Sequence, residues 1–252
     1  MRGLGVRRGG QPLATVALAA VSVAIFFLTH DFVRVLSLTR RSLSDSALEG
    51  YSTFGPYIAE WGEWWRVATG TFLHADLRHL IFNMLILYLL GRRLEHTVGP
   101  ALLAGTYVVS LLGGSAGALL HRPDVAAVGA SGAVYGVMGA AYVVEYLRGG
   151  NPWRDGLGTL ILINVVFSFL VPNISIGGHL GGLAAGVLAG FAIGDTSRRR
   201  HPPTLAERLS NEPIDTRMRR SPVMIWGLLA LIAAAGFAGA LAAATTWRSP
   251  LF

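Results

Sequence analysis

The sequence predicts an all-α protein, a polytopic bundle of membrane helices, on three observations. Hydrophobic residues make up 52% of the 252 residues and charged residues only 14%, whereas soluble domains usually carry about 25% charged residues. Apolar runs of roughly 20 residues recur along the chain, which is the length that a helix needs to cross a bilayer. Within two of these runs small residues recur at every fourth position, as they do where membrane helices pack closely.

Seven apolar runs are the predicted membrane spans. In chain order, they cover residues 13–30, 73–91, 100–120, 131–147, 156–171, 177–194 and 222–246. The first run follows a basic segment that is also typical of a signal peptide, but no small-x-small cleavage site leads into a soluble domain. We therefore expect the first run to be retained as a helix.

The placement of arginine predicts the orientation of these spans. All 21 basic residues are arginine, and most of them lie at the N-terminus or in alternate loops, around Arg92, Arg148 and Arg154 and throughout 195–221. Cytoplasmic loops of membrane proteins carry such an excess of basic residues. The predicted organisation is a cytoplasmic N-terminus (1–12), a six-helix core (13–194), a basic cytoplasmic loop (195–221), and a seventh helix with a short external tail (222–252).

The same composition indicates the partners and the setting. The orientation signals account for the net charge of +7, so the lipid bilayer is an expected partner and nucleic acid is not. The sequence contains no cysteine, which excludes disulfides and thiolate metal sites. Arginine without lysine, together with abundant alanine and glycine, fits a GC-rich genome. The expected location is therefore the plasma membrane of a bacterium.

Polar residues inside the predicted spans mark a candidate site, because such groups are costly in a bilayer and usually functional. They are His74, His79 and Asn83 in the second span, Ser131 and Tyr135 in the fourth, and His179 in the sixth. In the predicted orientation these three spans all run from outside to inside, and the polar groups lie near their beginnings. We therefore expect all of them at one shallow depth below the outer membrane face.

The glycine spacing predicts how closely these spans approach. The fourth span continues from Ser131 as Gly132-x-x-x-Gly136, and the sixth has glycine at every fourth position from Gly178. Alone, this pattern indicates only close helix packing. With Ser131 and His179 at matching helix ends, it predicts that the hydroxyl and the imidazole lie within hydrogen-bond reach.

These groups fit acyl transfer by a serine nucleophile. Ser131 would attack while His179, whose unperturbed pKa is about 6.5, removes its proton. We find no carboxylate in the outer half of the spans that would orient His179, which predicts a Ser-His dyad rather than a triad. The backbone N–H of Ser131 at a helix N-terminus, with Asn83 and His79 as further donors, would form an oxyanion hole.

Other known motifs fit these residues poorly, and the role of Tyr135 is open between two possibilities. Tyr135 lies one turn after Ser131 and either stacks on the imidazole or packs as an ordinary aromatic. The zinc-protease pattern His-Glu-x-x-His is absent, and His74 and His79 are five residues apart, which does not place two ligands on one helical face. The nucleophile elbow Gly-x-Ser-x-Gly requires glycine where this chain has Ala133. No metal or cofactor is predicted.

With these residues in place, the chain resembles the rhomboid family of intramembrane serine proteases over most of residues 13–194. Four motifs in the family's order carry the resemblance: GEWWRVATGTF with Trp65 and Arg66, FLHADLRHLIFNM, GASG and GGHLGGLAAG. The resemblance implies a six-helix rhomboid core, to which part of the family adds a seventh helix. Gly178 stands where alanine is usual and Ile174 where glycine is common, but neither departure removes a catalytic group.

The resemblance also implies roles for individual residues. Ser131 would be the nucleophile and His179 the general base, His79, Asn83 and the Ser131 amide the oxyanion hole, Tyr135 a stacking partner of His179, and His74 an additional donor or water-holding group. The partners would be single-span or other transmembrane proteins, cleaved near the outer membrane boundary. The fifth span, with Phe167 and Phe169, and the loop VPNISI would form the lateral gate and cap.

Two other classes of protein stay open. An inactive rhomboid-like protein would bind membrane clients without cleaving them, although such relatives typically lack the serine or the histidine. A transporter or channel would more often show helices broken at mid-membrane and charged residues along a path, which this sequence does not show.

Overall fold

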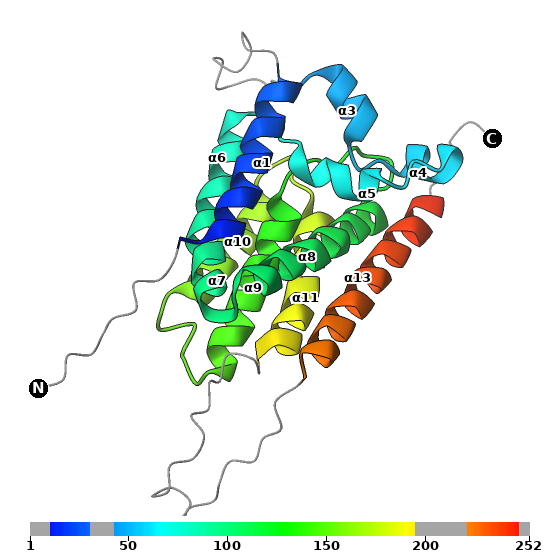
Figure 1. Ribbon diagram of the computed structural model, residues 1–252. Coiled ribbons are helices and arrows are strands. Elements are labelled where there is room, and N and C mark those ends of the chain that lie inside the picture. The colour runs from blue at the N-terminus through cyan, green and yellow to red at the C-terminus, as the bar shows by residue number, and fades with distance from the viewer. Residues whose placement is uncertain (1–10, 31–42, 195–220, 247–252) are drawn as a thin grey trace, which may run out of the picture.

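The computed structural model describes residues 11–30, 43–194 and 221–246, and Figure 1 shows them as a bundle of helices. Within these ranges the only β-contacts are two isolated bridges, His30 with Leu43 and Thr53 with Ala127, so the predicted all-α class is confirmed. The arginines of the N-terminus, nearly all of the basic loop 195–221 and the end of the external tail lie outside the described residues.

Long helices form the bundle, and short helices cover one of its ends. The long helices are α1 (Leu13–Thr29), α6 (Leu77–Ile86), which continues through a π-helical turn (Leu87–Gly91) into α7 (Arg92–Val98), α8 (Pro100–His121), α9 (Ser131–Leu147), α10 (Leu157–Leu170), α11 (Ile176–Ile193) and α13 (Pro222–Thr245). The short elements, at the upper end in Figure 1, are α3 (Asp45–Tyr51), α4 (Gly55–Trp61), α5 (Arg66–Thr69) and the 3-10 turn η1 (Gly70–Phe72).

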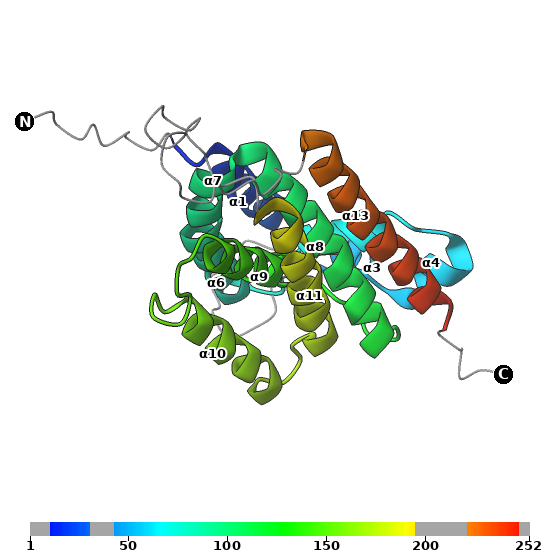
Figure 2. The same cartoon turned by 90° about the horizontal axis from the view of Figure 1, so that it is seen from below.

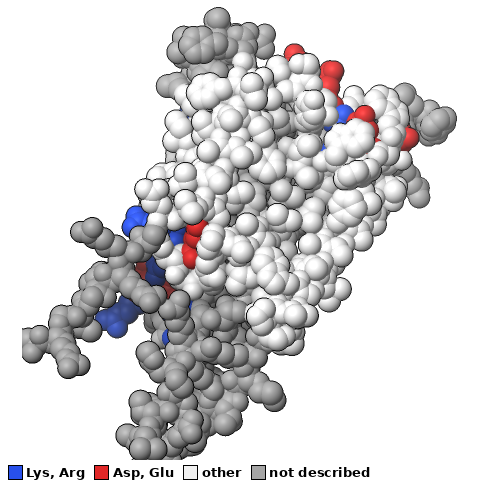
Figure 3. Space-filling view, in the orientation of Figure 1, with Lys and Arg blue, Asp and Glu red and all other residues white. Residues whose placement is uncertain are grey.

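Several helices match the thickness of a bilayer. By length and composition α8, α11 and α13 can each cross a membrane. The segments Arg66–Phe72 and Leu77–Val98, which are bent by 95° relative to each other, add a fourth if they form one span. The helices α1 and α10 are apolar but shorter. Figure 3 shows a broad uncharged surface between charged side chains near the two ends of the bundle. The number of seven spans stays a prediction.

Glycines bring α8, α9 and α11 into backbone contact at the centre of the bundle. A Cβ atom at Gly182 would lie 2.0 Å from the Gly132 carbonyl oxygen, and one at Gly186 would lie 2.0 Å from the Gly136 oxygen. A Cβ atom at Gly117 of α8 would lie 2.2 Å from the Gly177 oxygen of α11. Even a methyl group does not fit at these positions, so the close packing predicted from the glycine spacing is confirmed.

Arg66 organises the short helices that precede α6. Its side chain is 3% exposed, pairs through Nε with the Glu63 carboxylate and donates from Nη1 to the Ser52 carbonyl oxygen at 3.3 Å. The guanidinium also lies 4.5 Å from the centre of the Tyr57 ring, an arrangement that favours a cation–π contact. Thr53 donates to the Arg66 carbonyl oxygen at 2.9 Å. Arg66 therefore joins the beginning and the end of this segment.

The helix α13 packs along α8 (Figure 2) and reaches the short helices. Near its carboxyl end, Ala240, Ala243 and Ala244 join Ile58 of α4 in one buried apolar cluster. Phe237 lies against Trp64, with ring centroids 6.3 Å apart. The predicted seventh helix thus supports the segment that covers the upper end of the bundle.

Candidate active site

Ser131 is the first residue of α9, and the turn before it is shaped by Gly129. Gly129 has φ +122, and a Cβ atom there would lie 2.5 Å from His79 Cε1 and 2.7 Å from His79 Nε2. Only glycine fits this backbone beneath the ring. The ring of His79, from the first turn of α6, is therefore held against the chain two residues before Ser131.

His179 lies in the first turn of α11, whose N-terminus is capped by Ser175 accepting from the Gly178 N–H at 3.2 Å. The neighbours of the two predicted catalytic residues touch, because a Cβ atom at Gly132 would lie 3.1 Å from the Gly178 carbonyl oxygen. The beginnings of α9 and α11 are thus side by side. Among the hydrogen bonds formed by the described residues, none joins Ser131 to His179.

Tyr135 stacks on His179. The ring centroids are 4.1 Å apart and the planes are inclined by 18°. Tyr135 lies one turn after Ser131 on α9, so the same helix face that begins with the hydroxyl continues with the aromatic ring. Of the two arrangements considered for Tyr135, the structure has the stack.

Ser168 of α10 is a site residue that the sequence analysis missed. Its hydroxyl oxygen lies 2.7 Å from His179 Nδ1 and 2.7 Å from the Tyr135 hydroxyl oxygen. Both hydroxyl groups reach the Asn164 carbonyl oxygen, Tyr135 at 2.6 Å and Ser168 at 2.9 Å. The partner of His179 is a hydroxyl group and not a carboxylate. The available signal was weaker, a single serine between Phe167 and Phe169 in an apolar run.

Asn83 and His74 lie near His79. The Asn83 side-chain amide donates to the His79 carbonyl oxygen one turn earlier at 2.8 Å, which leaves its second N–H for another acceptor. The His74 ring is fully buried, 5.3 Å from the His79 ring centroid. Among the described residues neither His74 ring nitrogen has a hydrogen-bond partner.

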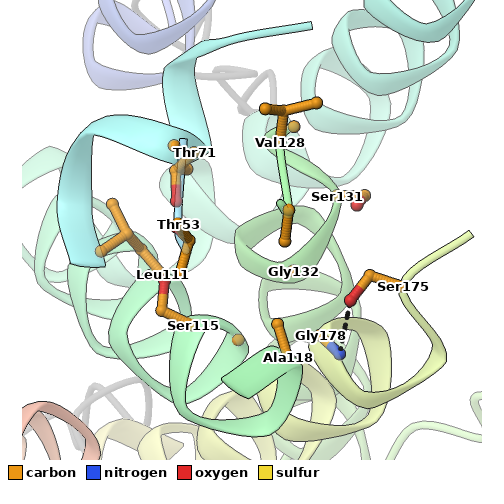
Figure 4. A pocket seen from close by; sticks show the side chains of 14 residues that line it. Thr53, Thr71, Leu111, Ser115, Ala118, Val128, Ser131, Gly132, Ser175 and Gly178 are labelled. Carbon is orange, nitrogen blue, oxygen red and sulfur yellow. Dashed lines mark hydrogen bonds between the residues drawn. The ribbon is translucent and has the colours of Figure 1, made fainter. Parts of the chain in front are cut away.

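A small cavity lies beside the beginnings of α9 and α11 (Figure 4). Its volume is about 30 Å³, and its polar lining includes Ser131, Ser175, Ser115, Thr53 and Thr71. A cavity needs about 10–15 Å³ of such volume and several polar partners to hold a water molecule. This space therefore suits water next to Ser131.

Comparisons with known proteins agree with this geometry. The Rhomboid domain family matches residues 61–196, which include every residue of the candidate site. The chain is 32% identical over 193 residues to "Rhomboid protease GluP" of Bacillus subtilis (strain 168), covering 75% of this chain and 36% of that protein. It is 35% identical over 144 residues to "Putative rhomboid protease YdcA" of the same organism, covering 56% of this chain and 72% of that protein.

A plant protein shows the same relationship. "RHOMBOID-like protein 5" of Arabidopsis thaliana is 36% identical over 144 residues, covering 54% of this chain and 46% of that protein. The chain thus spans only about a third to a half of the length of two of these relatives. The matched region contains the helices α6 to α11 with the buried polar cluster, and on this match the chain belongs to the rhomboid family and is an integral membrane protein.

Proposed function

We propose that this protein is an intramembrane serine protease that uses Ser131 and His179 as a dyad. The observation that carries the proposal is the fixed position of the His179 ring, which stacks on Tyr135 and contacts Ser168. An imidazole held in this way beside the beginning of α9 is ready to accept a proton. The two relatives whose printed names contain "rhomboid protease" support the same reaction class.

The reaction would follow the steps of acyl transfer. The Ser131 hydroxyl oxygen attacks the scissile carbonyl carbon while His179 takes the hydroxyl proton, giving a tetrahedral intermediate. His179 then returns the proton to the leaving amine, and the C–N bond breaks. A water molecule attacks the resulting ester with His179 as base, which releases the carboxylic acid and restores Ser131. The cavity next to Ser131 supports delivery of that water.

The oxyanion of the intermediate would be stabilised by groups on two helices. The Ser131 backbone N–H is the first of α9, where amides have no partner within the helix and the helix dipole favours negative charge. His79, held against Gly129, and the free N–H of Asn83 would add two donors. His74, packed edge-on to His79, would keep that ring in place or hold water beside it.

The substrates would be transmembrane segments of other membrane proteins. Ser131 lines a cavity together with Thr53 and Thr71 of the short-helix segment, which supports a site at that end of the bundle. With a cytoplasmic N-terminus in a bacterial plasma membrane, this end faces outward, and cleavage would occur near the outer boundary. The lipid-accessible helix α10, with Phe167 56% exposed, is the side on which a substrate helix would approach.

One observation favours a second candidate function. Because no hydrogen bond joins Ser131 to His179 among the described residues, the chain also fits an inactive relative that binds membrane clients. In that case the buried polar cluster would serve only to fix α10 against α9 and α11. Active enzymes without substrate also show long or poorly aligned catalytic hydrogen bonds, so we retain the protease as the main proposal.

The proposal is tested by cleavage of a single-span substrate in liposomes. Wild type, Ser131→Ala, His179→Ala and the control Ser22→Ala are compared with and without chelator. Ser22 of α1 is fully buried but does not contact the site. We expect equal cleavage by wild type and Ser22→Ala, insensitive to chelator, and a loss of about a thousandfold or more in the other two.

A fluorophosphonate probe, which reacts only with an activated serine, gives a second test that needs no substrate. Labelling of the wild type and not of Ser131→Ala or His179→Ala is the expected result. Cleavage that survives Ser131→Ala would contradict the mechanism. A folded wild type that neither cleaves nor reacts, but captures transmembrane segments, would establish the client-binding alternative.

A further inference from the structure

Ser168 is the sole buried residue in the external half of α10. The buried residues of this helix are Leu157, Gly158 and Ser168, and the first two lie at its opposite end. On either side of Ser168 the aromatic residues Phe167 and Phe169 are 56% and 61% exposed, whereas Ser168 is 3% exposed. A polar side chain that is turned inward from a lipid-facing helix requires hydrogen-bond partners.

The partners of the Ser168 hydroxyl are Nδ1 of His179, the Tyr135 hydroxyl and the Asn164 carbonyl oxygen. The contacts between polar atoms are Ser168 Oγ to His179 Nδ1 at 2.7 Å, Ser168 Oγ to Tyr135 Oη at 2.7 Å, and both hydroxyl groups to the Asn164 carbonyl oxygen. The Asn164 oxygen has no proton and can only accept. The two hydroxyl groups each have one proton, and a neutral imidazole has one.

Counting these protons selects one tautomer of His179. With the proton on Nδ1, three hydrogen bonds form: Nδ1–H to Ser168, the Ser168 hydroxyl to Asn164, and the Tyr135 hydroxyl to Asn164. With the proton on Nε2, the Ser168 hydroxyl must donate to Nδ1, and only two bonds form. The cluster therefore favours Nδ1–H by one hydrogen bond and leaves the Nε2 lone pair free to act as a base.

We propose that Ser168 is a positioning residue that holds His179 in the Nδ1–H tautomer, the part that a carboxylate plays in a catalytic triad. This inference rests on the proposed function, because Ser168 would support the same general base, His179. The dyad expected from the sequence then becomes a serine–histidine–serine arrangement, in which the third residue comes from α10. Ser168 donates its own proton to the Asn164 carbonyl oxygen one turn earlier. Its oxygen is therefore left to accept from the Nδ1–H of His179.

Kinetics of matched serine variants test the proposal. Ser168→Ala removes the acceptor, Ser168→Thr keeps a hydroxyl, and Ser22→Ala removes a buried hydroxyl that donates to the Leu18 carbonyl oxygen one turn earlier. Losing one hydrogen bond to the base predicts a fall in kcat of about tenfold for Ser168→Ala, with KM changed less than about twofold. Ser168→Thr should recover most of kcat, and Ser22→Ala should match the wild type.

The tautomer itself is measured by NMR of protein labelled with ¹⁵N-histidine. The His179 signals are identified by their loss in His179→Asn. In wild type near pH 8 we expect Nδ1 at the shift of a protonated ring nitrogen and Nε2 at that of an unprotonated one, and in Ser168→Ala a mixture of both tautomers. A purely structural role of Ser168 would not move these signals in a variant that still folds.

The outcomes separate this proposal from the proposed function. If wild type cleaves but Ser168→Ala matches it in kcat and in the His179 signals, the positioning role is wrong and the protease stands. If Ser168→Ala lowers kcat while its His179 signals stay those of wild type, tautomer control is likewise overturned. If the folded wild type neither cleaves nor reacts with the fluorophosphonate, both proposals fall together.

Discussion

The helices α11 and α10 both contribute to the surroundings of His179, but they are held in the bundle by different means. In α11 the buried residues other than His179 and Ile193 are all glycine or alanine, and they bring backbone against backbone. In α10 the apolar side chains of Leu157, Leu160, Ile161 and Val165 pack against the core, and Ser168 near the carboxyl end is its buried polar residue. Backbone contact thus fixes the first helix, whereas side-chain packing and the hydrogen bonds of Ser168 fix the second.

This difference bears on how a histidine is positioned inside a membrane. Between helices in lipid, close van der Waals packing and interhelical hydrogen bonds replace the hydrophobic effect as the source of association. His179 lies on α11, whose position depends on close packing along the helix. Its ring orientation depends on Tyr135 and on Ser168, the latter from a helix with few buried residues.

The largest loss of stability is expected when a methyl group is added at the glycine contact between α11 and α9. In Gly182→Ala the new methyl group would lie 2.0 Å from the Gly132 carbonyl oxygen, and neither backbone can move without separating α9 from α11. We expect a loss of about 3 kcal/mol in the free energy of unfolding, the upper end for overpacking. The measurement is unfolding in detergent, followed by tryptophan fluorescence.

The control is Gly227→Ala on α13, where a Cβ atom meets nothing within 4 Å. Its free energy of unfolding should equal or slightly exceed that of wild type, because alanine favours the helix over glycine. Equal stability of the two variants would mean that α11 is not fixed by backbone contact, and the contrast with α10 would disappear.

An intermediate loss in the free energy of unfolding is expected at α1, which like α10 has few buried residues and is held by hydrogen bonds to a polar side chain. The Glu95 carboxylate of α7 accepts from the Ala14 N–H, the Thr15 N–H and the Thr15 hydroxyl at 2.9, 2.8 and 2.7 Å. Glu95→Ala leaves these donors without their acceptor, and we expect a loss of about 2 kcal/mol. Glu95→Gln, which keeps one good acceptor, should lose less.

Exposed Glu49 of α3 supplies the control for this variant. Glu49→Ala should change the free energy of unfolding by less than about 0.5 kcal/mol. If Glu95→Ala changed the free energy of unfolding equally little, the hydrogen bonds of Glu95 would not be what holds α1 in the bundle.

Much of this architecture was predictable from the sequence because apolar length and glycine spacing are local signals. Each apolar run contains a helix, although the second helix begins at Leu77 and not at residue 73. The nearness of α9 and α11 was predicted from the glycine spacing, and the stack of Tyr135 on His179 was implied by the family resemblance.

The contacts that the sequence did not predict join residues far apart in the chain. Glu95 caps the beginning of α1 from 80 residues away, and Ser168 reaches His179 across a helix boundary. Neither residue has a distinctive neighbour pattern: a serine in an apolar run commonly donates to its own helix, as Ser22 does to the Leu18 carbonyl oxygen. The short helices between α1 and α6 were not predicted for a related reason. The side chain of Arg66 links them, and no apolar period in the sequence does so.

The smallest effect is expected on the lipid-facing side of α10. Leu162 is 53% exposed there, and Leu188 is 55% exposed on α11, so each is surrounded largely by lipid in both wild type and the unfolded state within the membrane. Leu162→Ala and Leu188→Ala should each change the free energy of unfolding by less than about 0.5 kcal/mol, because the helices differ on their buried faces and not on their outer ones. A loss above about 2 kcal/mol for Leu162→Ala, measured beside an unchanged Leu188→Ala, would show that the outer face of α10 also helps to hold it in the bundle.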